Sequence, residues 1–296
     1  MTVAEMQKRF GIAGAVLVAK GRGGIPAVAL SHQSGAEAEI SLLGAHVTSW
    51  CTPDGEERFF LSRYSEFKEG MPIRGGVPVI FPQFGTEGPY PKHGFARNCM
   101  WRLERTNLAE DGVVTAAFTL VDSSITRAVW PFSFRLDLEV CLAETLTMTL
   151  TCRNSDTTSF RFTTALHTYF AVADITKTSV EGLNGLLFRD RMAANTKSTE
   201  TREAVTFAGE VDRIYVRAPA ELVLRDGEAN RAIRIRQENM PDIVVWNPWQ
   251  DTARELADFA TEEYLEMACV ETCVIERPVE LRPGDHWTGT TVFAAE

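Results

Sequence analysis

Residues 134–152 read FRLDLEVCLAETLTMTLTC. Over 134–142 large apolar residues alternate with polar or small ones, and after a polar break at 143–145 the alternation resumes through 152. A period of two residues is typical of a strand with one buried face, and the short break is typical of a hairpin turn. The stretch therefore predicts two half-buried antiparallel strands.

Several other segments have the composition of strands, because they are short and rich in β-branched or aromatic residues. They are Glu39–Trp50, Gly112–Asp122, Phe160–Phe170, Leu222–Arg225, Ala232–Gln237, Asp242–Trp246 and Trp287–Ala294. Turn-forming residues such as Thr52–Gly55 and Arg282–Asp285 separate them, and helical periodicity is confined to Tyr64–Glu69 and Thr252–Tyr264. Many short strands with few helices predict an all-β fold, a large antiparallel β-sandwich with a few short helices.

The chain has 296 residues, of which 45% are hydrophobic, so it is long enough to bury a large core. No low-complexity linker or internal repeat divides it. The Gly- and Pro-rich stretch 70–94 contains Phe81, Phe84 and Tyr90, large apolar residues in which a flexible linker would be poor. We therefore expect one domain over residues 1–296, in which this stretch forms one wall of a site.

The formal net charge is −10, which argues against nonspecific binding to nucleic acid or to an anionic membrane. No stretch approaches the roughly 20 apolar residues that span a bilayer. The six cysteines lack the density of a disulfide framework, so we expect free thiols. These features favour a cytoplasmic protein without nucleic-acid or membrane partners, and we expect it to be a monomer.

The N-terminal segment has a weak likeness to a signal peptide, with Lys8-Arg9 before an apolar run at 10–19. Lys20–Gly23 follows at once, without a convincing small-residue cleavage site. We interpret the segment as a first strand followed by a Gly-rich turn.

His167 lies in one of the predicted strands, Phe160–Phe170. Strand alternation puts its side chain on the same face as Tyr169, away from the more apolar face. One interpretation is a histidine that is satisfied by a buried hydrogen bond. The other is a group that exchanges protons with a substrate.

Glu271 ends the run 265–271 and shares a predicted strand face with Met267 and Cys269. An unpaired carboxylate there would be costly to bury, so it either reaches solvent at the strand end or has a function. If folding brings His167 and Glu271 together, the pair could transfer protons in both directions on one small substrate.

Arginines that suit an anion lie upstream. Arg74 precedes Gly75-Gly76, where a planar guanidinium on a tight turn could bind two phosphate oxygens. Lys92, His93 and Arg97 follow on a neighbouring loop. Such a cluster is commonly a solvated surface, but here it is embedded among aromatic residues, which favours an anion site.

Trp246-Asn247-Pro248-Trp249 follows a β-branched strand. Aromatic faces beside amide and carboxylate groups suit sugar recognition, and two tryptophans at a turn equally suit a hydrophobic plug. Both interpretations stay open at this point.

The motifs that usually hold cofactors are absent. There is no Gly-rich dinucleotide or phosphate loop, no metalloprotease motif and no clustered His/Cys spacing. We therefore expect neither a cofactor nor a metal.

Taken together, these segments resemble the aldose 1-epimerase (mutarotase) superfamily, and within it the glucose-6-phosphate 1-epimerases, also called D-hexose-6-phosphate mutarotases. The resemblance covers about residues 36–293, and its specificity lies in the order and spacing of its landmarks. The landmarks are Leu43–Ala45, Ile73–Pro78, Phe81-Pro82, His93–Arg97, Leu166–Phe170, Val211–Tyr215, Trp246–Trp249 and Cys269–Glu271.

The resemblance implies a galactose mutarotase-like β-supersandwich that interconverts the α and β anomers of a hexose 6-phosphate, glucose 6-phosphate foremost. It assigns His167 as general acid and Glu271 as general base. It also implies that Arg74, Arg97 and Asp212 contact the substrate. Lys92 stands where relatives often carry Gln, so its contact is less firmly implied.

In this scheme Glu271 takes the proton of the C1 hydroxyl while His167 protonates the ring oxygen. His167 must then be protonated while Glu271 is ionised, so a proximity that raises the pKa of the histidine would help. Leu166 before His167, and the His93–Arg97 loop, favour the phosphorylated-sugar branch over galactose mutarotases.

Two alternatives remain. One is an aldose or galactose 1-epimerase for unphosphorylated sugars, in which Arg74 and Arg97 are structural. The other is a non-catalytic sugar-phosphate binding protein, which would not need both His167 and Glu271.

Overall fold

The alternating stretch at 134–152 forms β8 (Phe134–Leu142) and β9 (Leu146–Asn154), an antiparallel hairpin in which Leu142 pairs with Leu146. Every second residue of β8 is buried, as its sequence alternation predicts. The structure is a computed structural model that describes residues 1–296. All pairings between its named strands are antiparallel, which confirms the predicted all-β class.

The hairpin belongs to a nine-stranded sheet. In spatial order its strands are β15 (Ala204–Thr206), β12 (Thr178–Glu181), β17 (Glu221–Asp226), β18 (Arg231–Glu238), β21 (His286–Ala295), β9, β8, β7 (Val114–Val121) and β6 (Arg102–Leu108).

Two further sheets lie against it. A four-stranded sheet has the order β1 (Val16–Lys20), β2 (Pro26–Ser31), β3 (Glu37–Ser41) and β4 (His46–Cys51). An eight-stranded sheet has the order β14 (Thr196–Thr199), β13 (Leu187–Asp190), β16 (Val211–Tyr215), β19 (Asp242–Asn247), β20 (Met267–Leu281), β10 (Phe160–Leu166) and β5 (Val79–Ile80), with β11 (Tyr169–Ala171) also paired to β20.

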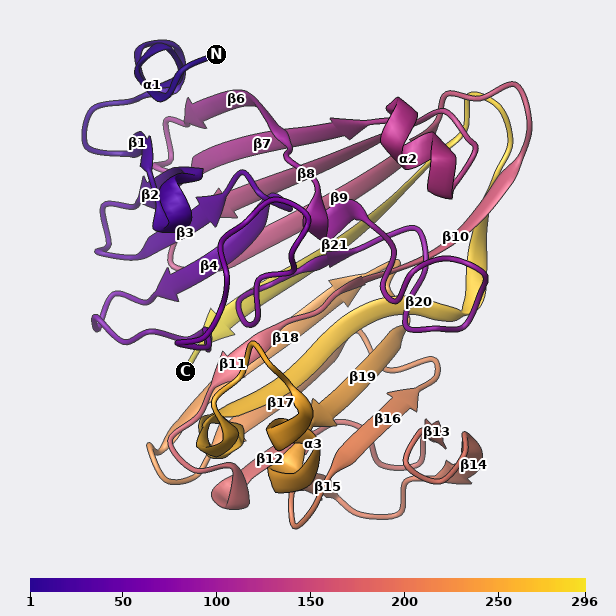
Figure 1. Cartoon of the computed structure of the whole chain (residues 1–296). Coiled ribbons are helices and arrows are strands. Elements are labelled where there is room, and N and C mark those ends of the chain that lie inside the picture. The colour runs from indigo at the N-terminus through magenta and orange to yellow at the C-terminus, as the bar shows by residue number, and fades with distance from the viewer.

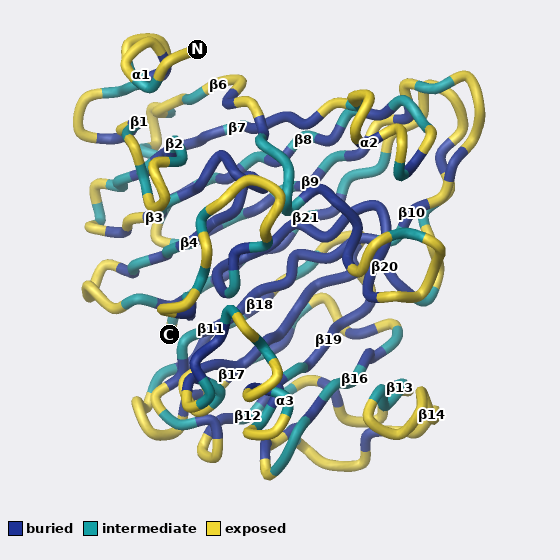
Figure 2. The backbone as a smooth tube through the Cα atoms, viewed as in Figure 1, coloured by how far each residue is buried: buried dark blue, intermediate teal, exposed yellow.

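Figure 1 shows the nine-stranded sheet as one layer, with the other two sheets in front of its two halves. Phe293 on β21 contacts rings from both, because its centroid is 6.1 Å from that of Trp50 and 5.5 Å from that of Phe170. The main core holds 61 buried residues and fills the space between the layers. Buried residues run along the central strands in Figure 2, and exposed ones gather in the loops.

Strand β20 separates this core from the site. Its Ala268 and Val270 belong to the main core, whereas Cys269 belongs to a small cluster on the other face of the sheet. Glu271 is the next residue on that outer face. Because β20 continues to Leu281, Glu271 lies within the strand and not at its end, so that part of the sequence prediction was wrong.

The helices are short. They are α1 (Val3–Phe10), α2 (Ser124–Val129) and α3 (Trp249–Glu255), with single-turn elements η1 (Arg22–Gly24), η2 (Ala96–Asn98), η3 (Ile175–Lys177) and η4 (Thr261–Glu266). None of the helices has the length and apolarity that crossing a bilayer requires.

The N-terminal prediction needs correction, because a helix precedes the first strand. In α1 the Thr2 hydroxyl and Glu5 form a capping box, and Phe10 is buried. The strand itself begins only at Val16, and η1 supplies the Gly-rich turn after it.

The predicted helix at Tyr64–Glu69 is also wrong. Ser65 Oγ donates to Arg74 O at 2.7 Å and accepts from Arg74 N at 2.9 Å, so this segment is bonded to a distant turn in place of its own backbone. The helix predicted over Thr252–Tyr264 is two pieces, α3 and η4, with a break between them. That residues 1–296 form a single domain stays a prediction.

Candidate active site

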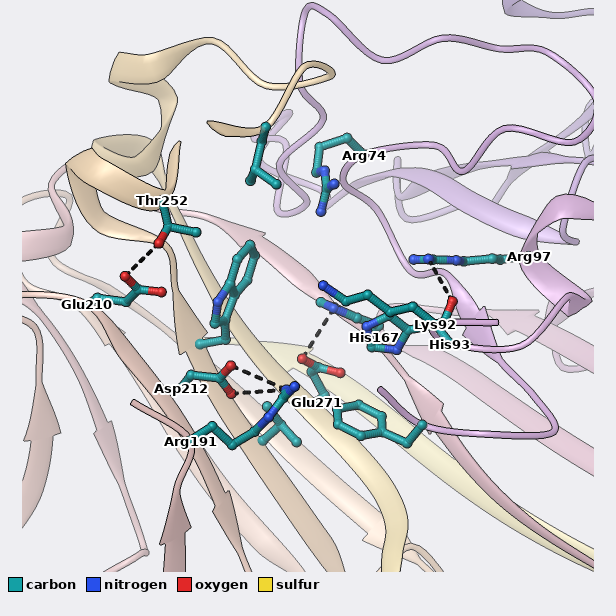
Figure 3. Close-up of a pocket in the computed structure, with 14 residues that line it drawn as sticks. Arg74, Lys92, His93, Arg97, His167, Arg191, Glu210, Asp212, Thr252 and Glu271 are labelled. Carbon is teal, nitrogen blue, oxygen red and sulfur yellow. Dashed lines mark hydrogen bonds and ion pairs between the residues drawn. The ribbon is translucent and has the colours of Figure 1, made fainter. Parts of the chain in front are cut away.

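A cavity of about 210 Å³ opens on the outer face of the eight-stranded sheet. That is the space of a small molecule and not of a single water. All eight residues singled out from the sequence line it: Arg74, Lys92, His93, Arg97, His167, Asp212, Trp246 and Glu271. Figure 3 shows their side chains converging from the sheet and from the loops above it.

The floor of the cavity follows from strand register. Val244 on β19 pairs with Glu271 on β20, and Trp246 pairs with Asp212 on β16. Residues paired directly across antiparallel strands point to the same face, so these side chains form two adjacent rows on the outer surface. Strand alternation thus places the carboxylates of Asp212 and Glu271 on the outer face of the sheet, beside Val244 and Trp246.

His167 and Glu271 meet at this floor. Nδ1 of His167 lies 3.3 Å from Oε1 of Glu271, with 8% of the histidine side chain and 1% of the glutamate side chain exposed. The pair lacks hydrogen-bond geometry, and both His167 Nδ1 and Glu271 Oε2 are buried without a partner. Buried polar atoms are nearly always hydrogen-bonded, so these two atoms are available to a ligand or a water in the cavity. His167 is therefore not a histidine satisfied within the core.

Aromatic rings hold His167 in place. It occupies the gap between β10 and β11, and its ring stacks on Tyr169 with centroids 4.8 Å apart and planes 7° apart. The Trp246 ring stands perpendicular to it at 6.1 Å. The ring of His93 lies 5.5 Å away, and His93 Nδ1 accepts a hydrogen bond from Gly85 N at 3.3 Å. That acceptor role leaves the His93 proton on Nε2.

The wall beside Arg74 depends on two glycines. Gly75 has φ +118° and Gly76 has φ +55°, and a Cβ on them would lie 2.4 Å from Phe60 O and 2.2 Å from Val47 O. No other residue fits such a turn without moving the backbone. This agrees with the role predicted for the Gly75-Gly76 pair.

His46 supports the same turn from below. It is fully buried, and its Nε2 donates to Gly75 O at 2.7 Å. Burial, together with the positive charge of Arg97, lowers the pKa of His46 to about 4. The folded protein therefore keeps this histidine neutral at a pH where the unfolded chain protonates it.

This difference predicts a pH-dependent contribution to stability. Below the ordinary histidine pKa of about 6.5 the unfolded chain binds a proton that the folded chain refuses, so the stabilisation is lost as pH falls. Substituting His46→Gln removes the titration. We expect the margin by which wild type exceeds H46Q in free energy of unfolding to shrink by about 2 kcal/mol between pH 7 and pH 5.

Urea unfolding at both pH values, followed by tryptophan fluorescence, measures that margin. The control is His286→Gln, which makes the same substitution at an exposed histidine on the surface. An H46Q margin that does not change with pH would contradict the assignment of a buried neutral His46.

The cations around the cavity differ in whether they are already paired. Arg74 binds Asp258, at 3.0 Å between Nη2 and Oδ1, and Arg191 binds Asp212 at 3.2 Å. Arg97 and Lys92 have no carboxylate partner, and the Nε of Arg97 is a further buried orphan. Burial lowers the pKa of Arg97 to about 10, so the guanidinium stays charged at neutral pH. Two unpaired cations on one side of a cavity form a site for an anion.

Folding shifts the proton affinities of the central pair in opposite directions. Burial, followed by the charges of Arg97 and Arg74, lowers the pKa of His167 well below its ordinary value. Burial and the negative charge of Asp212 raise the pKa of Glu271 well above its usual range. Proximity to Glu271 does not raise the pKa of His167, because desolvation and the nearby arginines outweigh that attraction.

Folding also creates one set of potential metal ligands that the sequence spacing does not reveal. Ligand atoms of His167, Cys269 and Glu271 lie within 4.8 Å of one another. Burial raises the pKa of the Cys269 thiol well above its ordinary value, so the sulfur is held as the protonated thiol, a poor metal ligand. Metal independence stays a prediction, and it is tested below with a chelator.

The structure separates the two tryptophans that the sequence left ambiguous. Trp246 lines the cavity, as a sugar-facing ring would. Trp249 packs on Tyr264, with centroids 5.2 Å apart, and serves as the plug.

Sequence reasoning missed several polar residues of the cavity, namely Arg191, Glu210 and Thr252. Glu210 stands two residues before Asp212, and Thr252 begins a segment that was predicted only as a helix. Strand alternation from Asp212 could have pointed to Glu210. Nothing local marks Arg191, which lies among other charged residues.

Comparison with known proteins adds to this geometry. The sequence profile of the family described as Aldose 1-epimerase matches residues 26–294. A relative from Cenchrus ciliaris is 39% identical over 266 residues, which cover 87% of this chain and 81% of the relative. One from Escherichia coli (strain K12) is 36% identical over 238 residues, covering 80% and 79%. Both carry the name "Putative glucose-6-phosphate 1-epimerase".

Solved structures agree. The crystal structure of "a putative mutarotase (YeaD)" from Salmonella typhimurium matches with a TM-score of 0.89 and 29% identity, covering 97% of this chain and 95% of that chain. A galactose mutarotase related enzyme from Lactobacillus acidophilus shares the fold, with a TM-score of 0.73 at 17% identity over 88% of this chain and 94% of that one.

Proposed function

The chain belongs to the aldose 1-epimerase family and is an epimerase with a galactose mutarotase-like β-sandwich, and from this premise we propose that it interconverts the α and β anomers of hexose 6-phosphates without a cofactor. Glucose 6-phosphate is the foremost candidate substrate. The observation that carries the proposal is the His167–Glu271 pair, 3.3 Å apart, in a cavity that also holds two unpaired cations.

The reaction needs one proton removed and one supplied. Glu271 takes the proton of the C1 hydroxyl while His167 donates a proton to the ring oxygen, and the C1–O5 bond breaks to give the free aldehyde. Rotation about C1–C2 turns the other face of the carbonyl toward O5. Closure with the two roles reversed forms the other anomer and returns both protons, so no net proton is consumed.

The pair must hold one proton between its two members for this chemistry. The raised pKa of Glu271 and the lowered pKa of His167 bring the proton affinities of the two groups closer together than in free side chains, so one proton can pass between them. The positive charges of Arg97, Arg74 and Lys92 are among the causes that lower the pKa of His167. A bound phosphate offsets those charges and so raises the pKa of His167, which favours the protonated acid when substrate is present.

We assign the phosphate to Arg97 and Lys92. Arg74 and Arg191 already face Asp258 and Asp212, whereas Arg97 and Lys92 have no such partner. The buried Nε of Arg97 has no acceptor within the protein, so its N–H is available to a phosphate oxygen. Arg74, held by Asp258 and by the Tyr169 hydroxyl at 3.0 Å, is left to contact sugar hydroxyls together with Asp212 and Trp246.

Anomer exchange measured by NMR tests the proposal, comparing glucose 6-phosphate with glucose and galactose. We expect exchange of glucose 6-phosphate to exceed the protein-free rate by far more than exchange of either free sugar, and to survive treatment with a chelator. Faster exchange of the free sugars would favour an aldose 1-epimerase for unphosphorylated substrates. Binding without any acceleration would indicate a non-catalytic sugar-phosphate binding protein.

We also propose that the protein works as a cytoplasmic monomer. All six cysteines are free thiols, which supports a reducing compartment. Size-exclusion chromatography with light scattering would test the monomeric state.

A further inference from the structure

The two sides of the cavity carry opposite charge. Arg97 and Lys92 come from the loop side, and Glu210, Asp212 and Glu271 come from the strands β16 and β20 or their edge. In Figure 3 Glu210 lies across the cavity from Arg97. A ligand whose phosphate lies at Arg97 therefore directs its sugar toward the acidic side.

Glu210 differs from the other two carboxylates. Asp212 is paired with Arg191 at 3.2 Å, and Glu271 is the proposed base. Glu210 has no cationic partner; its Oε2 accepts a hydrogen bond from the Thr252 hydroxyl at 2.7 Å. Burial raises the pKa of Asp212, and the negative charge of Glu210 raises it further, so that charge acts inside the cavity. Glu210 is thus the one carboxylate of the cavity that has neither a counter-ion nor an assigned reaction step.

We propose that Glu210 selects for a positive charge on the sugar, so that the enzyme also interconverts the anomers of hexosamine 6-phosphates. This inference rests on the proposed function, because it requires the phosphate to bind at Arg97 and Lys92 and the anomeric centre to lie at Glu271. The substrate class is a zwitterion, with an anionic phosphate at one end and a ring ammonium group at the other.

The physical basis is the field across a small cavity with low-dielectric walls. An unpaired carboxylate acts over several ångströms there, within the screening distance of physiological salt, so it need not touch the ammonium group. A hydroxyl at the same ring position is neutral and gains nothing from this charge. The Thr252 hydroxyl holds one oxygen of the Glu210 carboxylate at the cavity wall, and the selectivity comes from the charge of that carboxylate.

Three variants separate charge from shape. Glu210→Gln removes the charge and keeps an oxygen that can accept from Thr252. Glu210→Asp keeps the charge, and Thr252→Val removes the hydrogen bond while leaving the carboxylate. For each variant, NMR anomer exchange gives kcat/KM, and titration calorimetry gives Kd, for glucosamine 6-phosphate and for glucose 6-phosphate.

We expect wild type to turn over both sugars, and the preference for glucosamine 6-phosphate relative to glucose 6-phosphate to fall about tenfold in E210Q. In E210D and T252V the same ratio should stay within about threefold of wild type, because the charge remains. An equal loss on both sugars in E210Q would assign Glu210 a structural role and overturn the inference, as would an unchanged ratio.

The two failures are distinguishable. If wild type does not accelerate anomer exchange of glucose 6-phosphate, the proposed function is wrong, and the Kd ratio in E210Q still decides whether Glu210 selects charge. If wild type exchanges glucose 6-phosphate but the ratios do not respond to E210Q, the inference alone is wrong.

Discussion

Glu271→Gln is expected to reduce anomer exchange of glucose 6-phosphate toward the protein-free rate, a loss of roughly 10²- to 10⁴-fold for one proton-transfer group. The amide keeps the size of the side chain on the buried strand β20 but cannot take the proton of the C1 hydroxyl. Because the phosphate is assigned to Arg97 and Lys92, the Kd for glucose 6-phosphate should change little. Exchange spectroscopy by NMR and calorimetry measure the two quantities separately.

The matched control is Glu276→Gln on the same strand. Glu276 lies outside the cavity, where it pairs with Lys197 at 3.2 Å and with Arg189 at 3.3 Å, so its substitution should leave exchange unchanged. If E271Q retained near-normal activity, Glu271 could not be the base. If E271Q and E276Q lost activity equally, the loss would report on the integrity of β20.

Arg97→Ala should lower kcat/KM for glucose 6-phosphate by about 10²-fold or more, since removing one partner of a buried charge pair costs about 2–5 kcal/mol. The loss on free glucose should be much smaller, because glucose brings no anion to this side of the cavity. The ratio between the two sugars is the measurement, and it cancels any general loss of folded protein.

Arg102→Ala serves as the control for this variant. Arg102 lies five residues further on, exposed, in a surface ion pair with Glu104, and should affect neither sugar. Equal losses on glucose 6-phosphate and glucose in R97A would show that Arg97 does not bind the phosphate. Arg74 would then be the next candidate for that role.

The β-sandwich could be predicted because its strands are half-buried. The two-residue alternation of 134–152 survives as alternating burial in β8 and β9, and local sequence is enough to specify it. Segments held by distant contacts could not be predicted in this way. Ser65 bonds to Arg74 instead of continuing a helical turn, and no pattern within Tyr64–Glu69 encodes that partner.

The same distinction applies to the site. Residue type and turn chemistry were enough to single out Arg74, His93 and Arg97, and the resemblance added Asp212. The lowered pKa of His167 could not be predicted from the sequence, because burial and the position of Arg97 depend on three-dimensional packing. Glu210 was missed because what distinguishes it is the lack of a cationic partner. That lack can be recognised only once the positions of all charged groups in the cavity are known.

Strand β20 has a consequence for how such an enzyme can change over time. One residue inserted in β20 ahead of Val270 would turn the carboxylate of Glu271 toward the apolar core. The same insertion would turn Val270 toward the cavity. The register of these strands therefore cannot shift by one residue without moving the site's side chains to the wrong face. The segment 248–266, whose Thr252 and Leu256 line the cavity, follows no two-residue period, so a change in its length would not reverse a strand face. Changes in sugar preference should therefore arise by substitution of side chains that face the cavity, without any shift of the strands.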